Sequence, residues 1–199
     1  SYNFTLGYNY KENLNKLKIE AYYNYIDDFI AADRDGTTVD VEGEDFNNVF
    51  HDQYNALFTG LEVSGQYSVA QFNDLDFLTN FMVDFLKGYR TSNDKALSRI
   101  PQTKINAGLQ LTNEEWDAGL NYYHYFDKEF IGPFQTRTGG HSRLDFDLTR
   151  DFSYFDTSGH LMFTAANLLN VVGRDHLESK KAQVELPGRS FSFMLKLFY

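Results

Sequence analysis

Apolar and polar residues alternate with a period of two along most of this 199-residue chain. The pattern is clearest at the end, where Phe191, Phe193, Leu195, Leu197 and Tyr199 alternate with Ser190, Ser192, Met194 and Lys196. Such alternation is typical of β-strands with one apolar and one polar face. About nine segments show it: residues 2–10, 17–25, 57–69, 75–89, 105–111, 116–126, 143–149, 161–166 and 190–199. The chain is therefore predicted to be all-β and antiparallel.

The connections between these segments alternate in length. They are short near residues 11, 71, 113 and 155, and long over residues 31–53, 90–102, 129–140 and 172–187. Short turns on one side and long loops on the other are typical of an antiparallel transmembrane β-barrel in an outer membrane. A large soluble antiparallel barrel remains the alternative, although this much Phe and Tyr would overfill a small soluble core.

Composition excludes several classes of protein. A mean hydropathy of -0.47, without a long apolar run, excludes a bundle of membrane helices. A net charge of -10 repels nucleic acid, so none is expected as a partner. The chain has no cysteine, which removes disulfides, thiolate zinc sites and cysteine nucleophiles from consideration.

Short motifs along the chain resemble those of one family. The C-terminal third contains Ala166-Asn167-Leu168-Leu169-Asn170, then Arg174-Asp175-His176, then Pro187-Gly188-Arg189-Ser190-Phe191. Upstream stand Ile26-Asp27-Asp28-Phe29-Ile30, Gly60-Leu61-Glu62 and Arg99-Ile100-Pro101. Together they resemble landmarks of the TonB-dependent outer-membrane receptor family, in which the Asn-Leu segment closes the penultimate strand and Pro-Gly-Arg opens the last. The last two C-terminal motifs are similar to those of zinc-type and haem-type members.

The resemblance implies a barrel of about 22 strands around an N-terminal plug. We therefore expect residues 1–199 to be the C-terminal portion of a single outer-membrane β-barrel domain, about nine strands of it, with the plug domain absent. The implied partners are outer-membrane lipid, the missing N-terminal strands and plug, the inner-membrane TonB complex acting through the plug, and the barrel assembly machinery.

The implied location is the bacterial outer membrane, and the implied function is energy-coupled uptake of a divalent metal ion or a metal chelate. The cargo is not a resident cofactor, and none is expected. The runner-up is a complete small barrel acting as an adhesin or a passive pore.

The connection over residues 31–53 is predicted to be a long acidic loop. It carries Asp33, Asp35, Asp40, Glu42, Glu44, Asp45 and Asp52 against the single base Arg34, with His51 among them. Carboxylates and imidazole bind divalent cations, so candidate metal ligands are Asp40, Glu42, Glu44, Asp45, His51 and Asp52, with His176 from the last long loop. A solvated loop without a defined site is the plainer alternative.

The other histidines are expected to have lesser roles. His141 could join a cation site at the rim, His124 fits an aromatic belt, and His160 lies near a short turn. His141 and Ser142 are adjacent, so on a strand they point to opposite faces and cannot form a nucleophile-base pair. No catalytic residues are predicted, and the protein is not expected to be an enzyme. The polar parity, including Lys18, Glu20, Glu62, Asp74, Asp76 and Asp84, is expected to line a hydrated lumen.

Overall fold

Nine antiparallel strands, taken in sequence order, form one sheet in the described part of this computed structural model. The structure describes residues 1–198, without the side chains of Arg34 and Asp35. The strands are β1 (Tyr2–Glu12), β2 (Asn15–Val41), β3 (Glu44–Phe72), β4 (Leu75–Arg90), β5 (Lys104–Thr112), β6 (Trp116–Tyr125), β7 (His141–Tyr154), β8 (Thr157–Ala166) and β9 (Ser190–Phe198). The predicted antiparallel all-β fold is confirmed. Tyr199, the expected aromatic end of the last strand, lies outside the described residues.

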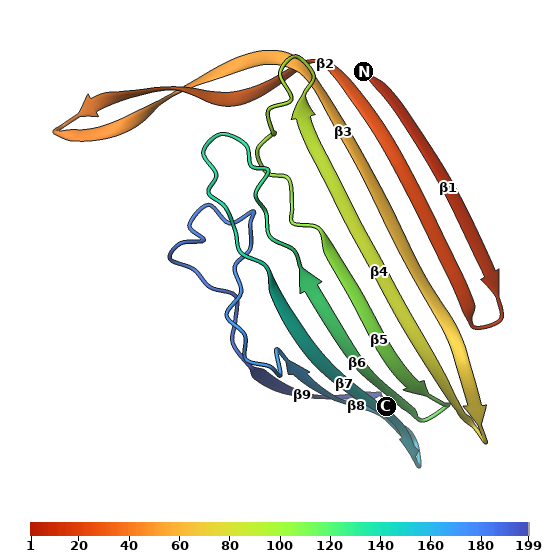
Figure 1. The fold of residues 1–199 in the computed structure, drawn as a ribbon. Coiled ribbons are helices and arrows are strands. Elements are labelled where there is room, and N and C mark those ends of the chain that lie inside the picture. The colour runs from red at the N-terminus through yellow and green to blue at the C-terminus, as the bar shows by residue number, and fades with distance from the viewer. Residues whose placement is uncertain (199) are drawn as a thin grey trace.

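The sheet is a curved, open wall (Figure 1). Each strand pairs with its sequence neighbours, and β1 and β9 form the two edges. An unpaired edge exposes backbone N–H and C=O groups that cannot be satisfied inside a lipid bilayer. Closure with further strands and a total of about 22 remain predictions.

The two ends of the sheet differ, as predicted from the connection lengths. At one end β1–β2, β3–β4 and β7–β8 are joined by tight turns, in which Asn13, Asn73 and Phe155 have φ angles of 52°, 56° and 52°. At the other end, residues 91–103, 126–140 and 167–189 form long connections. Figure 1 shows these long connections gathered on one side of the molecule.

The segment over residues 31–53, predicted to be a long acidic loop, is paired strand for most of its length. β2 and β3 continue as a paired hairpin to a turn at Glu42 and Gly43, which have φ angles of 56° and 86°. Figure 1 shows this hairpin extending away from the wall. Its carboxylates occupy both faces of an exposed ribbon, so no apolar alternation marks it, but its Val and Thr residues favour extended backbone.

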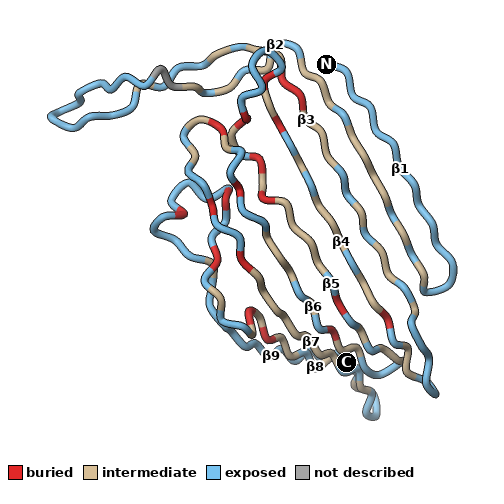
Figure 2. The backbone as a smooth tube through the Cα atoms, viewed as in Figure 1, coloured by how far each residue is buried: buried red, intermediate tan, exposed pale blue. Residues whose placement is uncertain are grey.

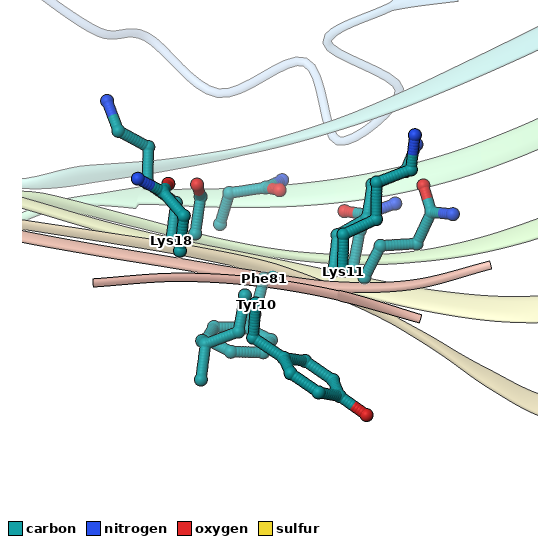
Figure 3. Close-up of a pocket in the computed structure, with 12 residues that line it drawn as sticks. Tyr10, Lys11, Lys18 and Phe81 are labelled. Carbon is teal, nitrogen blue, oxygen red and sulfur yellow. The ribbon is translucent and has the colours of Figure 1, made fainter. Parts of the chain in front are cut away.

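The strands present one apolar and one polar face. In Figure 3, Lys11 and Lys18 extend from one side of the sheet and Tyr10 and Phe81 from the other. The cavity drawn there, of about 550 Å³, is lined from both faces, and we assign it no function. On the polar face Lys18 lies 3.2 Å from Glu20 in an ion pair.

A small core lies near the long connections. Ala56, Leu97 and Ile100 are buried there, with Phe29, Tyr54, Phe58 and Leu86 packed against them. Figure 2 shows many of the buried residues at this end. The connections are thus packed against the sheet and against one another.

Among the described residues, no helix is long and apolar enough to cross a membrane.

The family-like motif at the end of β8 has a structural role. Asn167 accepts a hydrogen bond from the backbone N–H of Val171 and donates from Nδ2 to the carbonyls of Val171 and Pro187, at 3.0, 2.9 and 3.2 Å. Asn170 accepts from the N–H of Arg189 at 3.0 Å. These two side chains tie the end of β8 to the start of β9, and the motifs lie where the resemblance predicted, after the penultimate strand and before the last.

Candidate functional site

A cleft of about 690 Å³ lies where the long connections meet. The base of the β2–β3 hairpin, at residues 29–32, lines it together with the three long connections, at residues 97–99, 133–136 and 176–182. Its volume is in the range of small-molecule sites, and ligand sites in barrels often lie at the mouth. This cleft is therefore the candidate functional site.

The cleft has apolar and aromatic walls. Phe29 and Tyr54 pack together, with ring centroids 6.1 Å apart, and Leu97 and Phe134 contribute from two other connections. Aromatic side chains supply large contact areas in binding sites. The walls fit a ligand with an apolar or aromatic body.

A buried polar cluster lies at the edge of the cleft. Lys181 donates from Nζ to the carbonyl of Thr136 at 2.5 Å, to Oγ1 of Thr138 at 2.6 Å and to Nδ1 of His176 at 3.1 Å. Oγ1 of Thr138 is also 2.8 Å from Nδ1 of His176. The side chains of His176, Lys181 and Thr138 are buried. The cluster therefore joins two long connections through polar side chains that are shielded from solvent.

The electrostatics of the cluster are positive. Burial, together with the charges of Lys181 and Lys128, lowers the pKa of His176 to about 4, so this imidazole is neutral at pH 7. Burial also lowers the pKa of Lys181 and of Lys128. Neither lysine forms an ion pair with a carboxylate of the described residues. A buried ammonium without a carboxylate partner is unfavourable and attracts an anion.

Hydrogen bonds between connections shape the cleft. The hydroxyl of Ser98 donates to the carbonyl of Pro133 at 2.6 Å, and the N–H of Arg99 donates to Oε1 of Gln135 at 3.2 Å. Gly132 allows this approach, because a Cβ there would lie 2.3 Å from the backbone nitrogen of Ser98. The cleft is therefore held open by fixed contacts between its walls.

Arg90 anchors the extended hairpin to the wall. Its side chain, at the end of β4, forms an ion pair with Asp33 and lies 3.7 Å from a carboxylate oxygen of Asp52. The guanidinium also stacks over the ring of Tyr54 at 3.9 Å. Because Asp33 and Asp52 come from opposite strands of the hairpin, one arginine holds both strands.

The predicted metal ligands are spread out. Asp40, Glu42, Glu44 and Asp45 are exposed near the hairpin tip, His51 is exposed on β3, Asp52 faces Arg90, and His176 is buried in the cluster with Lys181. The described residues contain no group of three or more His, Cys, Asp or Glu side chains arranged to hold a metal ion. The metal site remains a prediction. The acids beside His176 serve the local turn, since Asp175 accepts from the N–H of Leu177 and Glu178 from that of Lys180.

His141 and Ser142 point to opposite faces, as predicted. His141 stacks on Tyr125 with centroids 4.6 Å apart, and it packs under Gly173. On the other face Ser142 lies 2.9 Å from Nδ1 of His124 and 2.8 Å from the hydroxyl of Tyr122. The sequence analysis missed this cross-strand Ser-His contact. No carboxylate of the described residues hydrogen-bonds to His124, so the contact lacks the orienting group of a catalytic triad.

Two residues with important contacts were also missed, Lys181 at the cleft and Arg90 at the base of the hairpin. Lys181 follows Lys180 in a polar stretch that reads as a solvated surface, and Arg90 ends a strand with no neighbouring acid in sequence. Their partners Thr138 and Asp33 come from distant segments. The sequence contains no local signal for either contact.

A curved antiparallel sheet with an exposed apolar face, tight turns at one end and long connections at the other is the wall of an outer-membrane-type β-barrel. The sequence of residues 1–171 matches the family described as TonB dependent receptor-like, beta-barrel. The chain belongs to this family. Members of the family are proteins of the bacterial outer membrane.

Solved structures share the fold. The chain is similar to the copper transporter OprC, with a TM-score of 0.80, 17% sequence identity and coverage of 98% of this chain and 30% of that chain. It is also similar to the siderophore receptor PirA from Acinetobacter baumannii, with a TM-score of 0.62, 18% identity and coverage of 98% and 31%. The chain thus spans about 30% of the length of these proteins. A search of curated proteins finds no match.

Proposed function

We propose that the receptor containing this chain takes up a metal ion or a metal chelate across the bacterial outer membrane, driven by energy from the inner membrane. Family membership supports this proposal, as do similar structures described as a copper transporter and a siderophore receptor. The observation that carries it is the cleft lined by the hairpin base and the three long connections of a receptor-family wall. A zinc-type or haem-type cargo is a narrower form of the same proposal.

In this proposal the chain forms part of the wall and of the cargo entrance. The apolar face contacts outer-membrane lipid, and the polar face contacts the plug and hydrated lumen. Strands outside this segment pair with the β1 and β9 edges, and the barrel assembly machinery inserts the complete barrel into the outer membrane. The TonB complex pulls on the plug, and the residues of this chain capture and release cargo without making or breaking covalent bonds.

The test is an uptake assay in the native organism with the full-length gene deleted or restored. Cells receive ⁶⁴Cu, ⁶⁵Zn or ⁵⁵Fe, each as the free ion and as a chelate, with and without a protonophore. We expect restored cells to accumulate at least one form of metal faster than deleted cells, and the protonophore to abolish the difference. Uptake that survives the protonophore would instead support the passive pore.

A further inference from the structure

We propose that Lys87, on the outward face of β4, binds a phosphate group of lipid A, the phosphorylated glycolipid in the outer leaflet of the bacterial outer membrane. This inference rests on the proposed function, because it requires the long connections to face the outside of the cell. It assigns one residue and one class of lipid to a face that otherwise has only a general contact with lipid.

Lys87 points to the apolar, outward face of the sheet. Side chains alternate between the two faces of a strand, and Phe81, which Figure 3 shows on the apolar side, has the same parity as Lys87 on β4. The two neighbours of Lys87 point the other way. Leu86 packs against the small core, and a Cβ at Gly88 would lie 2.7 Å from Cδ1 of Ile100 in that core. Lys87 itself is exposed, so its ammonium lies on the surface that the proposed barrel presents to lipid.

Lys87 also lies near the outer end of this face. It comes shortly before Arg90, where β4 ends at the long connections. Its ammonium lies 5.0 Å from the ring centroids of both Tyr89 and Phe130, and Phe130 belongs to the connection between β6 and β7. Tyr23, two strands away in the same cross-strand row, is exposed on this face as well. Aromatic girdles mark the two membrane interfaces of outer-membrane barrels, so we place Lys87 at the outer interface.

No carboxylate of the described residues forms an ion pair with Lys87. The acid next to Phe130 in sequence is Glu129, which lies 3.8 Å from Arg137, and the cross-strand partner of Lys87 is the uncharged Thr59. The faces of aromatic rings attract a cation but do not neutralise its charge. Anionic lipid headgroups attract basic side chains at a membrane surface. A lipid phosphate would therefore compensate the charge of Lys87.

Arg150 is another cation on the apolar face, at the opposite end of the sheet. It has the parity of Leu148 on β7 and pairs across strands with Trp116, whose ring centroid lies 4.8 Å from the guanidinium carbon. Two glutamates, at residues 114–115, line a cavity of about 530 Å³ together with Arg150. Their negative charge disfavours a phosphate there. In the proposed orientation Arg150 lies at the inner leaflet, so Lys87 is the cation placed to meet lipid A.

The outward face also carries hydrogen-bonding groups at the same end of the sheet as Lys87. Ser142, at the start of β7, has the parity of Leu144 and lies 2.8 Å from the hydroxyl of Tyr122 and 2.9 Å from Nδ1 of His124. Hydroxyl and imidazole groups on an otherwise apolar face fit the sugar of a glycolipid, while the aromatic rings beside them fit its acyl chains. This combination favours lipid A over a simple phospholipid.

The experiment titrates the purified full-length receptor, in detergent and freed of bound lipid, with defined lipids and measures each Kd by native mass spectrometry. The probes are diphosphoryl lipid A, lipid A without phosphate groups, and phosphatidylglycerol. We expect the wild type to bind diphosphoryl lipid A most tightly. Lys87→Met, which keeps an unbranched side chain and removes the charge, should bind it about tenfold more weakly, and Lys87→Arg should bind it nearly as the wild type does.

Two controls separate the site from general effects. Arg150→Met removes the outward cation at the opposite end and should keep the wild-type Kd for diphosphoryl lipid A. The yield of heat-resistant folded barrel should be the same for Lys87→Met and the wild type, because methionine suits a lipid-facing position. Lipid A without phosphate groups should bind the wild type and Lys87→Met equally.

The proposal is overturned if Lys87→Met binds diphosphoryl lipid A as the wild type does, if Lys87→Arg is as weak as Lys87→Met, or if Arg150→Met loses as much affinity. It is also overturned if the wild type binds phosphatidylglycerol, or lipid A without phosphate groups, as tightly as diphosphoryl lipid A. Energy-dependent metal uptake alongside any of these results would leave the uptake function standing. Binding as expected without energy-dependent uptake would refute the uptake function alone.

Discussion

The ammonium of Lys181 donates to Nδ1 of His176 across 3.1 Å, within one connection, while the hydroxyl of Thr138 reaches the same nitrogen from the neighbouring connection. This contact makes the imidazole both a bridge between connections and a group that resists protonation. A second positive charge on the ring would face Lys181 directly. The packing of residues 174–184 is thus linked to the charge of His176.

Acidification should loosen the connection between β8 and β9. The pKa of His176 falls from its usual 6.5 to about 4, because burial and the charges of Lys181 and Lys128 disfavour the imidazolium, although Asp175 opposes this shift. Between pH 6.5 and 4, His176 binds more protons when the connection is unfolded than when it is packed. The stability of the packed connection therefore falls as pH decreases from about 6.5 to about 4 and then levels. Hydrogen-exchange protection factors of residues 174–184 should show this slope, and His176→Gln should flatten it. An equal slope in both proteins would contradict the assignment.

Arg90→Met should release the extended hairpin. Loss of the guanidinium removes the ion pairs that Arg90 forms with Asp33 and Asp52 and is expected to destabilise the hairpin base by about 3 kcal/mol. The measurement is the rate of proteinase K cleavage within residues 31–53 of the full-length receptor. Arg137→Met is the matched control, because Arg137 and Glu129 are both exposed and 3.8 Å apart. Equal cleavage rates in the two variants would refute the anchoring role of Arg90.

Gly132→Ala should disturb the cleft, whereas Gly139→Ala should not. A Cβ at position 132 would meet backbone atoms of Leu97 and Ser98 at 2.5 and 2.3 Å, while one at 139 would meet its nearest neighbour, Asp127, at 4.0 Å. Overpacking against backbone typically costs about 1–3 kcal/mol. Hydrogen exchange of residues 97–99 should increase only in Gly132→Ala. An unchanged exchange pattern would show that the two connections do not depend on this close approach.

The two faces of β5 should respond differently to a positive charge. Leu109 is 62% exposed on the apolar face, so in the proposed outer-membrane barrel Leu109→Arg places a charge in lipid near the middle of a strand, at a cost of about 2–4 kcal/mol. Gln110→Arg is the control, because this position already donates to Asp117 at 2.6 Å on the polar face. The yield of heat-resistant folded barrel in outer membranes should fall only for Leu109→Arg. A fall for Gln110→Arg alone would reverse the assignment of the faces.

The sheet could be predicted because its signal is local. Each strand alternates apolar and polar residues within its own sequence, and this alternation predicts its two faces. The lengths of the connections then follow from the strand limits. Leu17, Gly65 and Phe81 then align across three strands in the register that this alternation requires. A strand of a transmembrane β-barrel is specified by one apolar face and one polar face.

The hairpin and the polar cluster could not be predicted because they depend on distant pairing. Ile30 pairs with Gln53 and Val39 with Phe46 in a ribbon exposed on both faces, so burial imposes no alternation there. His176 was expected to join the acids of residues 31–53 as a metal ligand, but its hydrogen-bond partner Thr138 lies 38 residues away in another connection. The spacing of His176 and Lys181, five residues apart, does not predict that both are buried, because their burial depends on how the connections pack.

The proposed cargo entrance must open to the outside of the cell, and single-cysteine labelling tests this orientation most directly, since this chain has no cysteine of its own. Ser179→Cys lies at the cleft and Asp156→Cys in the tight turn between β7 and β8. With a membrane-impermeant maleimide on intact cells that express the full-length receptor, freed of any other cysteine, we expect labelling of Ser179→Cys alone. Asp156→Cys should react only after the outer membrane is permeabilised. Labelling of Asp156→Cys in intact cells, with Ser179→Cys protected, would contradict the proposed orientation and with it the proposed path of cargo.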